Sequence, residues 1–190
     1  MTCLVRALLI GMLLATLVPS GHAQLPTETA SDLTPDQRRA YNDGLAEARK
    51  LMAEKQWARA GARLDTLIKE RPREAQARFL KGVVQTEQGD GEAAIAAFRS
   101  LVQDYPEIPE PYNNLAVLYG RKGEIESARL ALETAIKTAP NWATARENLG
   151  DVYVRLAAEQ YDRAVSLDRA NKIVATKLKL ARDLIASSNP

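Results

Sequence analysis

The chain has 190 residues, 46% of them hydrophobic and 5% aromatic, and 26 basic residues nearly balance 24 acidic ones, for a net charge of +2. So close a balance gives no reason to expect nucleic acid or an anionic membrane surface as the partner. The chain is rich in Ala, Leu, Arg and Glu, and no stretch alternates with period two, so we expect helices and no sheet.

The first 23 residues have the features of a secretory signal peptide. Arg6 supplies a short positive region, residues 7–18 form an apolar run of twelve, and Gly21 and Ala23 place small residues where a signal peptidase reads. The alternative is a membrane anchor, but a helix of this length spans only about 18 Å of a hydrocarbon core of about 30 Å. We therefore expect cleavage after Ala23 and no stable membrane insertion of the mature chain.

Cleavage would also remove the side chains on which many catalytic and metal sites depend. Cys3 and His22 are the only cysteine and histidine, so a mature chain beginning at Gln24 would hold neither. Disulfides, thiol or imidazole catalysis, histidine-ligated zinc and c-type haem attachment are then excluded. We expect no catalytic residue, no metal ligand and no cofactor in a mature chain of 25 basic and 24 acidic residues, a net charge of +1.

The mature chain should begin with a short polar leader, residues 24–33, which we expect to be disordered. Thr34 and Gln37 form a capping box and Pro35 takes the favoured first helical position, so the first helix should start at Thr34 and run to about Glu54. Further helices are expected near 57–70, 73–88, 91–104, 109–122 and 125–138. Because the linkers are only a few residues long, neighbouring helices should be antiparallel.

A period of about 34 residues runs through these helices and is typical of a helical repeat array. Pro72, Pro106 and Pro140 follow this period, and each should end a helix because proline lacks an N–H donor and crowds the preceding turn. Gly89 and Gly123 recur where a left-handed residue would end the first helix of a pair. Small residues recur at Ala60, Ala94 and Ala128 and at Ala48, Gly82 and Ala116. At these points two helices can approach closely.

On these positions the chain resembles the tetratricopeptide repeat family. The third unit matches best, with Tyr112, Leu115, Ala116, Tyr119, Gly123, Ala128, Leu132, Ala135 and Pro140 on signature positions. The first unit departs from the pattern, with Lys55 where glycine is usual and Gly44 where an aromatic residue is usual. The resemblance implies an all-α fold, a right-handed α-solenoid of antiparallel helix pairs, with three regular units at about 41–74, 75–108 and 109–142.

The fourth unit, about 143–171, departs from the period. It is shorter than the other units, and Arg169 stands where the proline would be. Its apolar stripe nevertheless continues in steps of three or four from Leu149 to Leu167. We therefore expect that the turn was deleted and that the two helices fused into one long helix of about 142–169, which makes this a degenerate unit.

A last helix is expected at about 172–187, with Val174, Leu178, Ala181 and Ile185 on one face. A solenoid needs a terminal element, because its last repeat otherwise exposes the core. We interpret this helix as that cap, and the alternative is a helix that binds a partner. Residues 34–190 would then form one repeat domain without an internal boundary.

The resemblance also implies where a ligand would bind. In this family the first helix of each unit lines a concave groove, and the matching positions here are the candidate residues for binding a partner. They are Asn42, Arg49, Phe79, Val83, Asn113, Asn114, Val117, Glu147, Asn148 and Asp151. The chaperone-binding members of the family hold two carboxylates with a clamp of Lys, Arg and Asn. This chain lacks the full clamp, and the later part of its groove holds carboxylates, so we expect a ligand other than a C-terminal acidic tail.

Two features of this set each have two interpretations. Asn114 and Asn148 hold the same position of successive units, and a stacked pair of amides can hold a peptide backbone whatever its side chains. Alternatively, each amide only bonds a neighbouring helix. Phe79, Leu80 and Val83 form an apolar patch, which is either ordinary core between repeats or a hydrophobic anchor pocket exposed in the groove.

These observations predict a periplasmic protein–protein interaction module or scaffold of the cell envelope. It would bind a peptide segment or another envelope protein in its concave groove, without catalysis. The alternative is a structural subunit of a cell-envelope assembly, docked through its convex face or its C-terminal helix. A hydrolase that uses carboxylates alone would need two of them facing across a pocket, and nothing in the sequence places them so. The signal, together with the lack of disulfides, favours a bacterial periplasm.

Overall fold

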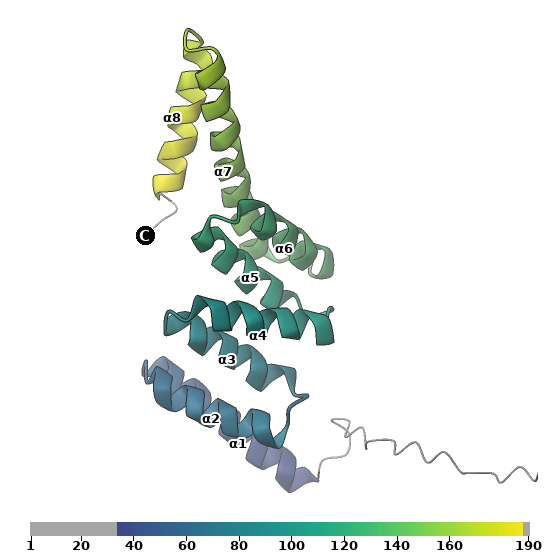
Figure 1. Cartoon of the computed structure of the whole chain (residues 1–190). Helices are drawn as coiled ribbons and strands as arrows, with labels where there is room; N and C mark the ends of the chain where they lie inside the picture. The colour runs from purple at the N-terminus through teal and green to yellow at the C-terminus, as the bar shows by residue number, and fades with distance from the viewer. Residues whose placement is uncertain (1–33, 188–190) are drawn as a thin grey trace, which may run out of the picture. The chain divides into compact units, whose positions relative to one another are not determined.

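The computed structural model describes residues 34–187, which form helices and contain no strand (Figure 1). The helices are α1 (Pro35–Ala53), α2 (Trp57–Glu70), α3 (Ala75–Glu87), α4 (Gly91–Asp104), α5 (Pro109–Lys122), α6 (Ile125–Thr138), α7 (Ala143–Leu167) and α8 (Lys172–Ser187). The all-helical repeat fold predicted from the sequence is therefore confirmed. The signal peptide expected at 1–23 and the leader expected at 24–33 lie outside the described residues.

The start of α1 is fixed by side chains, as its sequence predicts. The Thr34 hydroxyl accepts a hydrogen bond from the backbone N–H of Gln37 at 3.2 Å, and the backbone N–H of Thr34 donates to Gln37 Oε1 at 3.0 Å. Pro35 occupies the first turn, where its missing N–H is not needed. This reciprocal pair satisfies two N–H groups that the helix itself cannot bond.

The turns within the first three helix pairs all use a left-handed residue. Gly89 and Gly123 have φ angles of 81° and 77°, and Lys55 has φ 56° at the matching turn of the first pair. The first unit therefore departs from the pattern in residue type but not in backbone conformation. The departure costs about 1–2 kcal/mol, because the Cβ of lysine crowds the following carbonyl oxygen in this conformation.

Each helix packs against the helices before and after it in the chain, and α5 also contacts α7 directly. The recurring small residues are buried between the helices: Ala48, Ala60, Ala94 and Ala128 are fully buried. At Gly82 of α3, an added Cβ would come within 2.7 Å of the Phe98 ring of α4. The close approach expected from the recurring small residues is thus observed.

The unit 143–171 contains the single long helix that its sequence predicts. α7 runs unbroken from Ala143 to Leu167. Its first half packs through Ala145 and Val152 on the core shared with α4, α5 and α6. Its second half leaves that core and pairs with α8 around Ala158, Leu178 and Ala181 (Figure 1). The stack of helix pairs therefore ends in a hairpin of α7 and α8, in which α8 covers one side of α7.

The buried hydroxyl of Tyr41 has a raised pKa. The hydroxyl of Tyr41 on α1, buried near the backbone of Ala77, has no hydrogen-bond partner of good geometry among the described residues. Desolvation by burial and, second, the Glu74 carboxylate raise the pKa of Tyr41 to about 12 from 10.0, against the opposing effects of the Ala77 backbone and, after it, of the guanidinium of Arg71. That guanidinium lies 5.9 Å from the centroid of the Tyr41 ring.

Two glycines of the helices should respond oppositely to substitution by alanine. Gly82→Ala should lower the free energy of unfolding by about 1–2 kcal/mol, because overpacking against Phe98 outweighs the gain in helix propensity. Gly150→Ala should raise it by up to about 1 kcal/mol, because nothing lies within 4 Å of the added Cβ. Urea unfolding followed by circular dichroism measures both changes. Equal effects of the two substitutions would contradict the tight crossing at Gly82.

Tyr41→Phe should change how stability depends on pH. Unfolded tyrosine ionises near 10.0 whereas folded Tyr41 keeps its proton to about 12, so ionisation favours the unfolded state. The stabilisation is complete below pH 10 and is lost as the pH rises to 12, by about 2–3 kcal/mol. Tyr41→Phe should lack this loss and stay within about 1 kcal/mol of the parent at pH 7. Urea unfolding of both proteins at pH 7 and 11.5 tests this, and parallel pH profiles would contradict it.

Candidate functional site

Two cavities open between the first helices of successive pairs. The N-terminal cavity has a volume of about 350 Å³ and the C-terminal cavity about 500 Å³. The N-terminal cavity is lined by Arg49 of α1, Ala75, Gln76, Phe79 and Leu80 of α3, Leu101 of α4, Ile108 before α5, and Glu110 and Pro111 of α5. The C-terminal cavity is lined by Ala116, Val117, Gly120 and Arg121 of α5, Leu132 of α6, and Asn148, Asp151, Val152 and Arg155 of α7.

Both cavities open on the same side of α5. Glu110 lines the first cavity and Val117 and Arg121 line the second. Residues seven and eleven positions apart share one face of a helix, because a helix turns once every 3.6 residues. We call the two cavities together the groove.

The N-terminal cavity is mainly apolar, and its aromatic wall belongs also to the core. Phe79 and Leu80 are partly buried and line the cavity, while the Phe79 ring packs 5.7 Å from the Phe98 ring, centroid to centroid. Val83 packs against the core and lines neither cavity. Both interpretations of the apolar patch, as core between repeats and as a pocket wall, therefore apply. Phe79 and Leu80 pack on the core and also line the cavity, while Val83 only packs on the core.

The predicted asparagines of α5 and α7 form hydrogen bonds within the protein. The side-chain N–H of Asn148 donates to Asn113 Oδ1 at 2.8 Å, and that of Asn114 donates to the Glu110 carbonyl at 2.9 Å. Asn148 thus bonds a neighbouring first helix, but through Asn113 instead of Asn114. The bond to Asn113 holds the amide of Asn148 in place at the edge of the C-terminal cavity.

Half of the predicted site residues line the groove. Arg49 and Phe79 line its first cavity and Val117, Asn148 and Asp151 its second. The others lie elsewhere: Val83 in the core, Asn113 and Asn114 in the hydrogen bonds above, exposed Glu147 outside both cavities, and Asn42 in a separate hollow.

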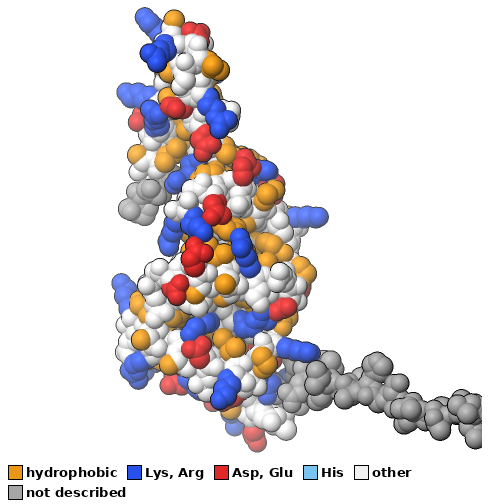
Figure 2. All heavy atoms as spheres, in the orientation of Figure 1, with side chains coloured by type: hydrophobic (Ala, Val, Ile, Leu, Met, Phe, Trp, Pro, Cys, Tyr) orange, Lys and Arg blue, Asp and Glu red, His pale blue; other side chains and the backbone are white. Residues whose placement is uncertain are grey.

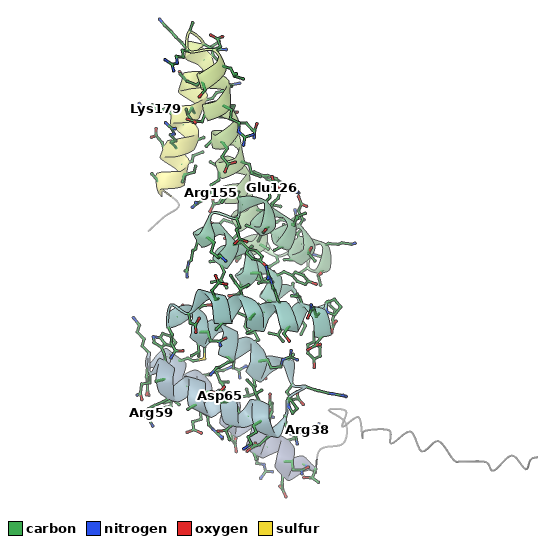
Figure 3. All side chains as sticks on the ribbon, in the orientation of Figure 1. Arg38, Arg59, Asp65, Glu126, Arg155 and Lys179 are labelled. Atoms are coloured by element: carbon green, nitrogen blue, oxygen red, sulfur yellow. The ribbon has the colours of Figure 1, made fainter. Side chains whose placement is uncertain are left out.

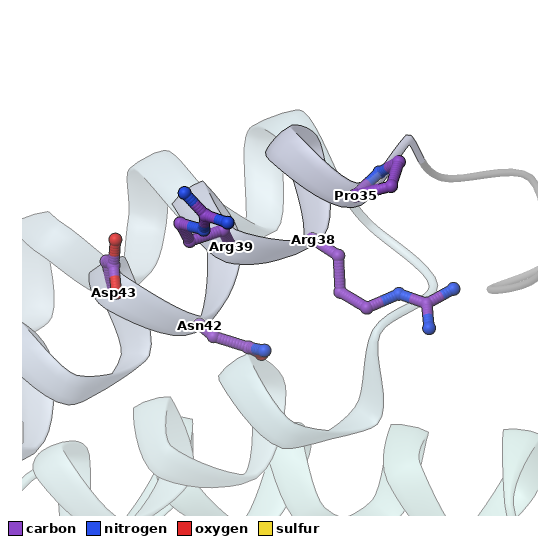
Figure 4. Close-up of a pocket in the computed structure, with 5 residues that line it drawn as sticks. All are labelled: Pro35, Arg38, Arg39, Asn42 and Asp43. Atoms are coloured by element: carbon purple, nitrogen blue, oxygen red, sulfur yellow. The ribbon is translucent and has the colours of Figure 1, made fainter.

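Among the described residues, the hollow at Asn42 is lined by one helix alone. Its described lining residues, Pro35, Arg38, Arg39, Asn42 and Asp43, all belong to the first turns of α1 (Figure 4). A site that holds a ligand needs lining groups that converge from more than one direction. We therefore do not assign this hollow as part of the groove.

The structure places two arginines in the part of the groove where the sequence indicated carboxylates. Arg121 and Arg155 line the C-terminal cavity together with Asp151. The repeat positions of the fourth unit also offered Arg155 as a groove residue, whereas Arg121 was missed. The repeat period could have found Arg121, because the two arginines are one full period apart. Ile108 was missed for another reason, since it lies in the connection before α5 and not on a first helix.

Residues 34–187 contain neither a cluster of metal ligands nor a membrane-spanning helix. No group of three or more His, Cys, Asp or Glu side chains there could hold a metal ion. None of the helices in this range combines the length and hydrophobicity needed to cross a membrane. Figure 2 shows Lys, Arg, Asp and Glu side chains spread over the visible face, with hydrophobic side chains between them.

Comparison with known proteins agrees with this architecture. Residues 45–108 and residues 85–149 match two family models that are both described as tetratricopeptide repeat. Human tetratricopeptide repeat protein 8 is 37% identical over 90 residues, which are 44% of this chain and 17% of that protein. This chain therefore corresponds to less than a fifth of the length of that relative.

Two similar solved structures contain peptides. The type III secretion chaperone SycD of Yersinia enterocolitica, in complex with a peptide of the translocator YopD, has a TM-score of 0.58 and 13% identity over 64% of this chain and 98% of that one. The first such domain of Spaghetti (RPAP3), bound to an HSP90 peptide, also has a TM-score of 0.58 and 13% identity, over 62% and 93%. At this identity the likeness shows a shared fold. Together with the two matching family models, the repeat period and the stacked helix pairs, it shows that the chain belongs to the tetratricopeptide repeat family.

Proposed function

We propose that this protein is a non-catalytic protein–protein interaction module of the bacterial periplasm that binds an extended segment of another envelope protein in the groove. The observation that carries the proposal is the pair of cavities opening on one side of α5. A row of cavities along one face can take successive side chains of an extended peptide, whereas a small metabolite needs only one enclosed pocket.

The chemistry of the two cavities is suited to a peptide. Phe79, Leu80 and Ile108 give the N-terminal cavity apolar walls, and its volume lies within the range of about 300–1,000 Å³ that is usual for ligand pockets. Burial of one aliphatic or aromatic side chain there would supply most of the affinity. The C-terminal cavity adds arginine, asparagine and aspartate groups, which would orient the peptide and select its sequence.

Two further observations support a non-catalytic role in peptide binding. The peptide complexes of SycD and Spaghetti have the same fold, although fold alone does not establish function. Within the groove, Glu110 lines one cavity and Asp151 the other, so neither cavity brings two carboxylates face to face. A hydrolase that uses only carboxylates would need such a pair.

The periplasmic location is proposed from the sequence. Residues 1–23 combine Arg6, an apolar run and small residues before Gln24, the pattern of a cleaved secretory signal. The chain from Gln24 contains no cysteine and so would fold without disulfides in an oxidising compartment.

The groove is tested by a pair of matched substitutions on exposed helix positions. Val117, 39% exposed, lies in the C-terminal cavity, while Leu130, 56% exposed on α6, lines neither cavity. Val117→Glu should reduce partner recovery at least about fivefold, because a charge would be buried under the peptide, whereas Leu130→Glu should leave it unchanged. The measurement is affinity capture of the tagged full chain from the periplasmic fraction of a bacterium that expresses it. Retention of every partner by Val117→Glu would contradict binding in the groove.

A second function, that of a structural subunit held through α8, is favoured by one observation. Ile173, Leu180 and Leu184 share one face of α8 and are all more than half exposed, and Leu167 at the end of α7 is 89% exposed. Figure 2 shows Lys and Arg side chains along the same hairpin. A terminal helix that faced only water would be expected to have a polar outer side, so this apolar face favours a protein partner.

The two functions are separated by substitutions on α8. If α8 docks on a large assembly, Leu180→Glu should abolish co-migration of the protein with that assembly. The matched control is Ala175→Glu, at another exposed position of the same helix. Our main proposal expects both variants to keep the partners of the parent, because neither residue lines the groove. Size-exclusion chromatography of the captured complexes provides the measurement. Loss of the assembly in Leu180→Glu alone, with Val117→Glu unaffected, would favour the structural function instead.

A further inference from the structure

Two equivalent arginines converge on the C-terminal cavity. Arg121, near the end of α5, and Arg155, in the middle of α7, occupy the same position of successive units. Both line the cavity of about 500 Å³ between those helices. Figure 3 shows Arg155 on α7, close to where α7 passes α5 and α6. The repeat thus brings two guanidinium groups to one side of the groove.

No carboxylate in the described part of the chain forms an ion pair with either arginine, whereas some other arginines of the protein are paired. Arg63, Arg78 and Arg129 are paired with carboxylates at 2.7, 2.6 and 2.6 Å. The side chains of Arg121 and Arg155 form no hydrogen bond or ion pair with another described residue. A guanidinium is always charged, so each side chain keeps its positive charge although no carboxylate pairs with it. The pair is therefore available to an anionic group from outside.

The surroundings of the pair favour a carboxylate on a peptide over a mobile ion. Asp151 lines the same cavity and has an interaction of its own, so the cavity holds two positive charges and one negative charge. Arg155 is partly buried, which reduces its hydration and strengthens its attraction for an anion. Val117, Leu132 and Val152 supply apolar lining beside the charges, as the aliphatic part of an acidic side chain would require.

We propose that Arg121 and Arg155 bind the carboxylate of an Asp or Glu side chain within the bound segment, while the N-terminal cavity takes an apolar side chain of the same segment. This inference rests on the proposed peptide-binding function and names its ligand class. It is distinct from the carboxylate clamp expected at other positions of the repeats, which this chain lacks. The planar fork of arginine matches a carboxylate through two parallel hydrogen bonds.

The geometry also sets the spacing between the two recognised side chains. Glu110 in the first cavity and Arg121 in the second are eleven positions apart on α5, about 16 Å at 1.5 Å per residue. An extended peptide covers that distance in about five residues at 3.3–3.6 Å per residue. The groove should therefore select segments in which an acidic residue lies about four or five positions from an aromatic or aliphatic one.

A peptide library tests this directly. Random peptides of about twelve residues, which reach about 40 Å when extended, are displayed on phage with their C-termini fused to the coat protein, so that no free terminal carboxylate is present. Selection on the full chain should enrich an apolar and an acidic residue at the stated spacing. Selection on Arg121→Glu with Arg155→Glu should keep the apolar residue and replace the acidic one by Lys or Arg.

Affinities of the selected peptides complete the test. A fluorescent selected peptide with an amidated C-terminus should bind Arg121→Gln with Arg155→Gln at least about tenfold more weakly than the parent, since a charged hydrogen-bonded pair is lost. Arg163→Gln with Arg169→Gln, at two exposed positions outside the groove, is the matched control and should bind like the parent. Thermal melts check that all variants fold.

The possible failures are distinguishable. If selection yields peptides without an acidic preference, or if the glutamine pair binds them like the parent, the arginine site is wrong while binding in the groove stands. If a selected peptide binds when it is synthesised with a free C-terminal carboxylate but not when it is amidated, the proposed acidic side chain is wrong. If no peptide is enriched from any library, both the inference and the proposed function are overturned.

Discussion

The close crossing of successive helices is the constraint on which the remainder of the structure depends. It is possible because alanine or glycine occupies each crossing point, as at Ala60, Ala94 and Gly82. At Gly82 the Phe98 ring fills the space where a Cβ would lie, and the same ring packs against Phe79. Small residues in one helix and a large one in the next therefore set the helix spacing. At that spacing, the first helices of successive pairs lie close enough for their side chains to line the same cavity.

The same constraint explains why the fourth unit ends differently. Gly89 and Gly123 adopt left-handed turns that let a second helix fold back on the first. Between Ala143 and Leu167 no residue has that role, and Gly150 lies within continuous helix. The second half of α7 therefore leaves the stack and pairs with α8 alone, around a small core of buried side chains. A small core covers less apolar surface, which accounts for the exposed aliphatic residues of this hairpin.

The groove combines apolar walls with charged side chains because two parts of the repeat contribute to it. Early positions of the first helices and the connection before α5 supply apolar walls, including Phe79 and Ile108, which face a cavity while their neighbours complete the core. Later positions of α5 and α7 supply charge, through Arg121 and Arg155. In the proposed function, apolar burial would give affinity and charge would give selectivity, so the groove would discriminate among segments that share a hydrophobic residue.

Proline, glycine and small residues act locally and recur once in each repeat, so the helices, their antiparallel order and the fused α7 could be predicted from the sequence. The sequence also located Arg49, Phe79, Val117, Asn148 and Asp151 in the groove. Which side chains meet depends on packing in three dimensions: Asn148 bonds Asn113 instead of Asn114, and Val83 packs against the core. These side-chain contacts depend on how far each helix is rotated and shifted against the next. Packing across the crossings sets that rotation, and a period along the chain does not encode it.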